Sequence, residues 1–356
     1  PAAADAQTIN AGGKLVTPGL VDAHTHLIFG GWRQNELALK LHGAGYLDIL
    51  AAGGGILSTM RATKAASEEQ LEAKASAALD EMLRFGTTTA EAKSGYGLST
   101  GEECKALRVI GKLQKHHVMD LAATFMGAHA VPEAYRDNRQ GYLELLCEEM
   151  LPAVREQGIA EFCDVFCEKG VFSAEESRRI LLTGRQYGLR PKIHADEIEA
   201  IGGSELAGEI GAVSAEHLIV CPPSGIASMA EGGTVACCLP ATSFYLGAAY
   251  APVQDMVQAG VPVAMATDFN PGSCPCLNMQ LVISLGCLRY RLTPEQALTA
   301  VTLNGAAAIC RADRIGSIEP GKQADILIWN AEDLDYICYR LGSNLVDTVI
   351  KKGNVV

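Results

Sequence analysis

Short apolar runs alternate with amphipathic stretches along most of the chain. Eight of these runs are rich in apolar or β-branched residues and predict strands, namely residues 19–27, 87–92, 121–128, 161–167, 192–195, 212–218, 234–239 and 261–267. Between them, apolar residues recur at the spacing of a helix face, over residues 68–84, 101–117, 141–156, 173–187 and 202–210. Ser173 followed by Glu176 also predicts a capping box. Strand and helix alternating over about 250 residues predict an α/β fold, a (β/α)8 TIM barrel.

The last part of the chain has a different pattern of apolar and turn-forming residues. Two more helical stretches, residues 277–285 and 293–308, follow the eighth run, and from Gly316 short strand-like runs alternate with Gly, Pro and Asn turns. Strands outside a closed barrel need other partners, so we expect a small β-sandwich domain built from N- and C-terminal segments. The predicted division gives residues 1–15 and 313–356 to the small domain and residues 16–312 to the barrel. The chain lacks an initial Met and starts near a strand-like segment, residues 7–10, so we expect the N-terminal part of the small domain to be truncated.

Composition narrows the possible partners and surroundings. The 29 basic and 41 acidic residues give a net charge of −12 without a local Lys/Arg cluster, so nucleic acid is not an expected partner. No apolar run approaches the roughly 18 residues that span a bilayer, so we expect no membrane partner. Several of the 12 cysteines lie inside predicted strands, which indicates buried, reduced thiols and a cytoplasmic location.

Histidines and aspartate end several of the predicted strands. His24 and His26 share one face of the first strand, and His194 and Asp268 follow the fifth and eighth. In a barrel these strand ends meet at one face. Three imidazoles and one carboxylate suit one Zn or Fe ion and leave a position open for water. Taken alone, the His24–His26 pair could equally be two core histidines bonded to backbone carbonyls; the four ligand types together favour a metal site.

Such an ion lowers the pKa of its bound water toward about 7 and polarises a carbonyl, which is hydrolytic chemistry. The chain has neither a phosphate-binding loop nor a Gly-x-Ser-x-Gly nucleophile motif. The triplet Gly53 to Gly55 lacks the strand-turn-helix context of a dinucleotide site. It is a candidate segment for covering the pocket.

Several segments of the chain resemble motifs of a known protein superfamily. Residues 16–26 (VTPGLVDAHTH) and 316–325 (GSIEPGKQAD) resemble the amidohydrolase superfamily. Five further motifs resemble the imidazolonepropionase family within it, namely residues 24–33 (HTHLIFGGWR), 93–98 (KSGYGL), 127–132 (GAHAVP), 194–197 (HADE) and 267–273 (TDFNPGS). The combination of five motifs makes the resemblance specific.

The resemblance implies a metal-dependent hydrolase of histidine degradation. Its reaction opens the ring of 4-imidazolone-5-propanoate to N-formimidoyl-L-glutamate, by attack of a metal-bound water on the cyclic amide carbonyl. By the same resemblance one divalent or trivalent ion, Zn or Fe, would be held by His24, His26, His194 and Asp268. A homodimer is also implied.

The resemblance also assigns roles around the substrate. Arg33 would bind the propionate arm, because a guanidinium grips a carboxylate through two hydrogen bonds. Glu197 would contact a ring nitrogen, His217 the carbonyl or the water, and Asp268 would act as base and then acid. How these three divide the proton transfers stays open. Further substrate contacts are expected from Tyr96, His129, Asn270, Gly272 and Ser273.

Three alternatives stay open at this point. Two-metal members of the superfamily place a Lys at the end of strand four, where residues 164–168 carry none and Lys169 follows; this favours one metal. A mononuclear nucleobase deaminase would use the same ligands, but a neutral base offers no carboxylate to Arg33. A catalytically inactive barrel is the third alternative, and the presence of every expected ligand counts against it. The residue types do not distinguish Zn from Fe.

Overall fold

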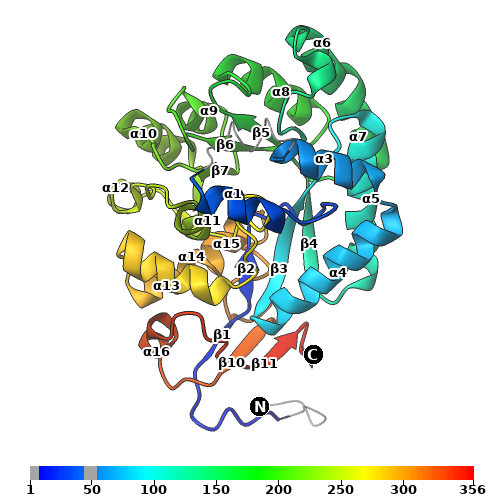
Figure 1. Ribbon diagram of the computed structural model, residues 1–356. Coiled ribbons are helices and arrows are strands. Elements are labelled where there is room, and N and C mark those ends of the chain that lie inside the picture. The colour runs from blue at the N-terminus through cyan, green and yellow to red at the C-terminus, as the bar shows by residue number, and fades with distance from the viewer. Residues whose placement is uncertain (1–7, 44–53) are drawn as a thin grey trace.

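The computed structural model in Figure 1 describes residues 8–43 and 54–356, and it contains the predicted barrel. Eight parallel strands pair in chain order from β2 to β9. They are β2 (Leu20–Asp22), β3 (Thr87–Lys93), β4 (Asp120–Ala128), β5 (Phe162–Cys167), β6 (Arg190–Ala195), β7 (Ser214–His217), β8 (Val235–Cys238) and β9 (Val263–Met265). The (β/α)8 prediction is therefore confirmed.

Helices follow the strands and surround the barrel (Figure 1). In chain order they are η1 (Gln34–Glu36), α1 (Leu37–Leu41), α3 (Ile56–Ala65), α4 (Glu68–Arg84), α5 (Thr100–His116), η2 (Glu133–Tyr135), α6 (Arg139–Glu144), the π-helical η3 (Leu145–Met150), α7 (Leu151–Gln157), α8 (Ala174–Gln186), α9 (Gly203–Glu209), α10 (Pro223–Gly232), α11 (Pro240–Leu246), α12 (Val253–Gln258), α13 (Met279–Tyr290), α14 (Pro294–Ala300), α15 (Leu303–Ala307) and α16 (Leu334–Tyr339). The predicted capping box is present, since Ser173 accepts from the Glu176 N–H and Glu176 bonds back to the Ser173 N–H.

The barrel closes between its first and last strands through residues just beyond both. The Asp22 carboxylate accepts from the Thr267 N–H at 3.0 Å and from its hydroxyl at 2.6 Å. Farther along, the Asp268 N–H donates to the His24 carbonyl at 3.0 Å. The first and eighth strands are thus shorter than predicted, because the backbone leaves the regular ladder where these polar residues begin.

A small antiparallel sheet lies at one end of the barrel (Figure 1). Its order is β1 (Val16–Pro18), β10 (Ile326–Trp329), β11 (Val346–Lys351) and β12 (Asn354–Val355). Trp329 is buried there and donates its indole N–H to the Thr17 hydroxyl at 2.8 Å. N- and C-terminal segments pair as expected, but the described residues form one sheet, without a second layer.

Two predictions about the N-terminal segment need correction. Strand β1, residues 16–18, pairs with β10, whereas the sequence boundary had placed it in the barrel. Residues 8–10 form no strand, and residue 7 lies outside the described part of the chain. Gly53, in the segment considered as a cover for the pocket, also lies outside the described residues. The division into two domains stays a prediction.

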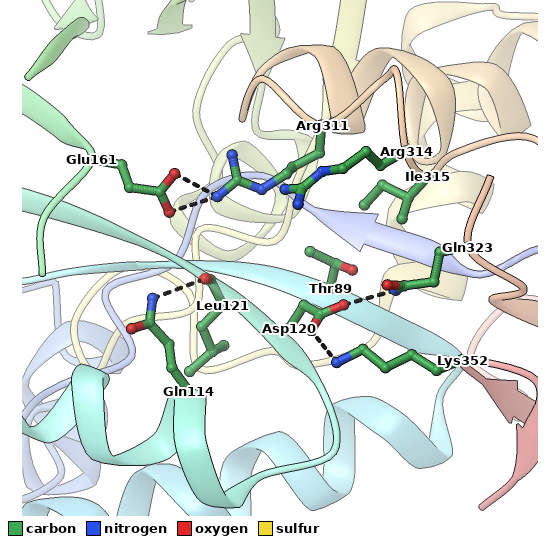
Figure 2. A pocket seen from close by; sticks show the side chains of 10 residues that line it. All are labelled: Thr89, Gln114, Asp120, Leu121, Glu161, Arg311, Arg314, Ile315, Gln323 and Lys352. Atoms are coloured by element: carbon green, nitrogen blue, oxygen red, sulfur yellow. Dashed lines mark hydrogen bonds and ion pairs between the residues drawn. The ribbon is translucent and has the colours of Figure 1, made fainter. Parts of the chain in front are cut away.

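The small sheet packs against the amino-terminal ends of β3 and β4. The Asp120 carboxylate, at the start of β4, contacts Lys351 at 2.8 Å, Lys352 at 2.6 Å and the Gln323 amide at 2.8 Å. Figure 2 shows the cavity beside this contact, about 380 Å³ in volume, where the Arg311 guanidinium faces Glu161. This end of a TIM barrel serves stability, while the opposite end carries chemistry.

All 12 cysteines lie in the part of the chain that the structure describes, and they form no disulfide there. Within residues 8–43 and 54–356, no helix combines the length and the apolar character that crossing a membrane requires.

Asp120→Asn tests the ionic contact between the small sheet and the barrel. We expect the free energy of unfolding at pH 7 to fall by about 1–2 kcal/mol, since the carboxylate is partly exposed and screened by water. Although burial opposes it, hydrogen bonds from Lys351 and Lys352 lower the pKa of Asp120 from 3.8 to about 2. The stabilisation is thus fully present above pH 4 or so and is lost as the pH falls toward about 2.

Urea unfolding of wild type and Asp120→Asn at pH 7 and pH 3 measures this effect. The difference between the two proteins should be smaller at pH 3. An equal difference at both pH values, or an altered kcat at pH 7, would contradict the assignment.

Candidate active site

The carboxyl ends of the barrel strands bring the predicted metal ligands together. His24 and His26 follow β2, His194 lies in β6, and Asp268 follows β9. The Asp268 Oδ1 atom lies 3.4 Å from His24 Nε2 and 3.6 Å from His26 Nε2. His26 Nε2 in turn lies 3.4 Å from His194 Nε2. All four side chains are buried.

These three separations are compatible with a shared metal ion, although the structure divides the predicted ligands between two groups whose atoms lie within 4.8 Å of one another: His24 with His26 and Asp268, and His24 with His194 and His217. Ligand atoms that lie about 2.1 Å from one ion, at tetrahedral angles, are about 3.4 Å apart. Burial comes first among the causes that hold the pKa values of His26 and His194 well below the usual range, so both rings are neutral and have a lone pair for a metal. The His24 Nε2 atom faces the Asp268 carboxylate, and, although burial opposes it, the Glu216 charge raises the pKa of His24 to about 9. The donor set therefore suits a divalent ion such as Zn or Fe.

His217, at the end of β7, completes a second, overlapping group. Its ring nitrogen and those of His24 and His194 lie within 4.8 Å of one another. His217 has a φ of +70° and Asp268 a φ of +57°, both in the left-handed region that residues other than Gly seldom adopt, although Asp and His do so more often than most. Backbone strain of this kind is concentrated at functional sites, where the surrounding structure holds it in place.

The Asp268 carboxylate is held ionised in the centre of the site. Its Oδ2 atom accepts from the Thr242 hydroxyl of α11 at 2.7 Å. Burial would raise its pKa, but His24, His217 and Thr242 outweigh burial and lower the pKa to about 2. Asp268 is therefore ionised over the neutral pH range. Sequence analysis did not identify Thr242, which lies in a helix without a recognised motif.

Tyr96 and His129 form the wall of the site next to His26. The His129 ring stacks on His26 with centroids 4.8 Å apart, and its Nδ1 lies 2.9 Å from the Gly95 carbonyl. Burial lowers the pKa of His129 to about 4, so its ring is neutral. The buried Glu103 carboxylate, which sequence analysis missed, shapes the Tyr96 loop by accepting backbone N–H groups of Gly95, Gly97 and Leu98.

Arg33 lies in a structured position, with a side chain that is 14% exposed. The buried Glu36 carboxylate accepts from its Nε at 3.0 Å and its Nη2 at 2.8 Å. The Nη1 atom lies against Gly272, where an added Cβ would be only 2.0 Å away. Glu36 therefore fixes one edge of the guanidinium, and Gly272 makes room for the other. Gly55, in the segment considered as a cover, also donates its N–H to Glu36, at 2.7 Å.

Asn270 and Ser273 build the loop after β9. The Asn270 amide donates to the Asp268 carbonyl and to the Ser273 hydroxyl, and its oxygen accepts from the N–H groups of Gly272 and Ser273. Because its side chain is fully used within the loop, Asn270 positions Asp268 and Gly272. Its expected direct contact with substrate stays a prediction.

Glu197 lies beside His217, with Oε1 3.7 Å from the His217 Nδ1 atom. Burial raises the pKa of Glu197, so its proton is more tightly held than that of an ordinary glutamate. The two predicted catalytic residues thus sit on the side of the site formed by β6 and β7. The opposite wall carries Tyr96 and Arg33.

A fully buried ionic network lies below the ligands, and sequence analysis did not predict it. It contains Glu91, Lys93, Asp164, Lys192 and Glu216, from strands β3, β5, β6 and β7. Glu216 contacts the His24 Nδ1 atom, and Asp164 lies 3.1 Å from the His194 Nδ1 atom. Removing one member of a buried ion pair usually costs about 3–5 kcal/mol. Lys169, the lysine closest to the position of a bridging Lys, is 67% exposed and pairs with Glu199.

The amidohydrolase family matches residues 15–356. The chain belongs to the amidohydrolase family. The imidazolonepropionase of Alkaliphilus metalliredigens (strain QYMF) is 55% identical over 349 residues, 98% of this chain and 83% of the relative. That of Streptococcus gordonii is 53% identical over 345 residues, 97% of this chain and 82% of the relative. The predicted resemblance to this group of amidohydrolases is confirmed.

Solved structures with this amidohydrolase fold are more distant in sequence. The 5-methylcytosine deaminase from Klebsiella pneumoniae, liganded with 5-fluorocytosine, has a TM-score of 0.76 at 19% identity and covers 100% of this chain and 90% of its own. An adenosine deaminase from Xanthomonas campestris with bound Zn has a TM-score of 0.71 at 21% identity, covering 96% and 80%. At these identities the likeness concerns the fold.

Gly272→Ala tests the contact between the β9 loop and Arg33. The new methyl group would collide with Arg33 Nη1, so the guanidinium must move out of its position. We expect a rise in KM of about tenfold, equivalent to roughly 1.4 kcal/mol, with unchanged metal content. Steady-state kinetics with metal analysis would measure both. Loss of metal together with an unchanged KM would show that Gly272 supports Asp268 instead.

Proposed function

We propose that this chain is a metal-dependent imidazolonepropionase, which hydrolyses the cyclic amide of 4-imidazolone-5-propanoate to N-formimidoyl-L-glutamate. The observation that carries the proposal is the convergence of His24, His26, His194 and Asp268 at the carboxyl end of the barrel, with Arg33 against Gly272 in the loop that follows Asp268. Relatives that are 53–55% identical over nearly the whole chain bear this name.

The metal would supply Lewis acidity for the attack of water on the amide carbonyl. His24, His26 and His194 would hold it through their Nε2 atoms, together with the Asp268 Oδ1 atom. The ionised Asp268 then takes a proton from the attacking water through its carboxylate and passes it to the leaving ring nitrogen. Thr242, by donating to Oδ2, keeps that carboxylate in one orientation.

Arg33 would bind the propionate arm of the substrate. Glu36 occupies the Nε and Nη2 edge, so the substrate carboxylate would meet the other edge, where Nη1 lies beside Gly272. A fixed guanidinium loses little freedom on binding, which favours affinity. Tyr96 and His129 would contact the ring, since both side chains lie against His26.

Glu197 and His217 would bind the reacting end of the substrate. Burial raises the pKa of Glu197, which favours the protonated form that can donate a hydrogen bond to a ring nitrogen. His217, the last residue of β7, would contact the carbonyl oxygen. Ser273 and the backbone at Gly272 would complete the contacts at the propionate end. A single Zn or Fe ion, a homodimer and a cytoplasmic location remain predictions.

The second candidate is a nucleobase deaminase. The structural likeness to deaminases supports it only at the level of the fold. A neutral base would leave the Arg33 guanidinium without a carboxylate, so this alternative explains less of the site. Release of ammonia from cytosine or guanine, without turnover of 4-imidazolone-5-propanoate, would decide for the deaminase. Turnover of the imidazolone that a chelator abolishes and added Zn²⁺ restores would decide for the proposed function.

Asp268→Ala tests the proposed proton transfers. The variant loses both a ligand and the base, so we expect kcat to fall by at least about 10²–10⁴-fold. The comparison is made with Zn²⁺ added to saturation and the bound metal quantified, which separates loss of metal from loss of the base. A metal-loaded variant with more than a tenth of the wild-type kcat would rule out Asp268 as the base.

Arg33→Ala tests recognition of the propionate. Losing one or two charged hydrogen bonds is worth about 1.5–3 kcal/mol, so KM should rise by roughly 10–100-fold while kcat changes little. The matched control is Arg136→Ala, at an arginine of the η2 turn that has no place in the proposed site. A fall in kcat equal to the rise in KM would show that Arg33 acts on the reaction step instead.

A further inference from the structure

The Lys93 ammonium lies inside the barrel, surrounded by three carboxylates. Its Nζ atom is 2.8 Å from Glu91 Oε2, 2.7 Å from Asp164 Oδ2 and 3.0 Å from Glu216 Oε2. The side chains of all four residues have 0% exposure. Such a group of carboxylates needs a cation, because water does not reach it to solvate the charges.

Two imidazole rings connect this cluster to the proposed metal ligands. The His24 Nδ1 atom contacts Glu216, while its Nε2 lies 3.4 Å from Asp268. The His194 Nδ1 atom lies 3.1 Å from Asp164, while its Nε2 lies 3.4 Å from His26 Nε2. Each ring therefore has one nitrogen on each side. A carboxylate that accepts the Nδ1 proton fixes the tautomer and turns the Nε2 lone pair toward the metal.

The atoms around Lys93 are themselves ligand types that bind metals. Oxygens of Glu91 and Glu216 lie with a His24 nitrogen within 4.8 Å of one another, and oxygens of Asp164 and Glu216 do so with a His194 nitrogen. Zinc would require oxygens at about 2.0–2.2 Å, whereas the ammonium keeps them at 2.7–3.0 Å. Lys93 thus occupies a position that has the donors for a second cation.

We propose that the Lys93 ammonium is a built-in second cation of this site. It holds Asp164 and Glu216 against the Nδ1 atoms of His194 and His24, and it prevents a second metal ion from binding among these carboxylates. Lys93 is a positioning residue, acting through the two histidines. The inference rests on the metal site of the proposed function.

Lys192 provides the contrast. Its Nζ atom contacts Glu91 at 3.0 Å and Glu216 at 2.9 Å, and the carbonyl oxygens of Ala23 at 3.2 Å and Ala308 at 3.3 Å. It has the same charge and burial as Lys93, but its described contacts include neither Asp164 nor a histidine. A variant of Lys192 therefore removes a buried charge without opening the space between the two histidines.

The test compares Lys93→Ala, Lys93→Met and Lys192→Ala with the wild type. Each protein is stripped with a chelator, titrated with Zn²⁺ by calorimetry and analysed for bound zinc by mass spectrometry. We expect one tightly bound Zn²⁺ per chain in the wild type and in Lys192→Ala, and two in Lys93→Ala. Lys93→Met fills the space with an apolar chain, so it should bind one Zn²⁺ about 10–100-fold more weakly than the wild type.

Several results would overturn the proposal. Binding of one Zn²⁺ by Lys93→Ala, or of two by Lys192→Ala, would show that Lys93 is not the residue that keeps a second metal ion from binding. A Zn²⁺ affinity of Lys93→Met equal to that of the wild type would show that Lys93 does not position His24 and His194. If Lys93→Ala folds at no Zn²⁺ concentration while Lys93→Met folds, a metal ion cannot replace the ammonium, and the proposal also fails. Failure of the proposed function is distinguishable, because it would appear as a wild type that binds one Zn²⁺ but does not turn over 4-imidazolone-5-propanoate.

Discussion

The pairing of two buried imidazoles with two buried carboxylates is the constraint on which this site depends. Glu216 faces His24 and Asp164 faces His194, each at the Nδ1 atom. An imidazole free to rotate or to change tautomer would present a proton to the metal as often as a lone pair. The carboxylates remove that freedom, but only if their own charge is balanced in the barrel interior, where Lys93 and Lys192 supply two positive charges.

The same residues close the barrel and carry the chemistry. Backbone hydrogen bonds between residues 24–26 and 268–269 join the first strand to the last, so the metal ligands cannot shift without opening the barrel. The opposite end has a separate task, because Asp120 and the small sheet lie at the amino-terminal ends of the strands (Figures 1 and 2). Stability and catalysis therefore rest on different contacts at the two ends.

Much of this arrangement could be predicted from sequence. Apolar runs located all eight strands, although the first and last proved shorter than predicted, and the strand ends identified His24, His26, His194 and Asp268 as candidate ligands of one ion. The rule that puts His24 and His26 on one face, a spacing of two, applies equally to Glu91 with Lys93 and to Lys192 with His194. Applied there, it would have indicated charged residues pointing into the barrel.

The sequence alone does not show which side chains contact each other across the barrel. Lys93 meets Asp164 only because the register pairs Lys93 with Thr124 of β4, and Thr124 with Phe162 at the start of β5. The pairing of Arg33 with Glu36 depends on the local turn of η1, and the use of Asn270 within its own loop depends on the turn after β9. The first and eighth barrel strands end early because polar side chains replace the ladder where the barrel closes, and residues 16–18 pair with β10 outside the barrel.

Anomalous X-ray scattering from crystals of the purified enzyme, recorded on both sides of the zinc and iron absorption edges, tests the central claim most directly. The account predicts one strong peak per chain, about 2.0–2.2 Å from the Nε2 atoms of His24, His26 and His194 and from the Asp268 carboxylate, with Lys93 still between its three carboxylates. A peak bound by His217 in place of His26 and Asp268, or a second peak among Glu91, Asp164 and Glu216, would contradict it.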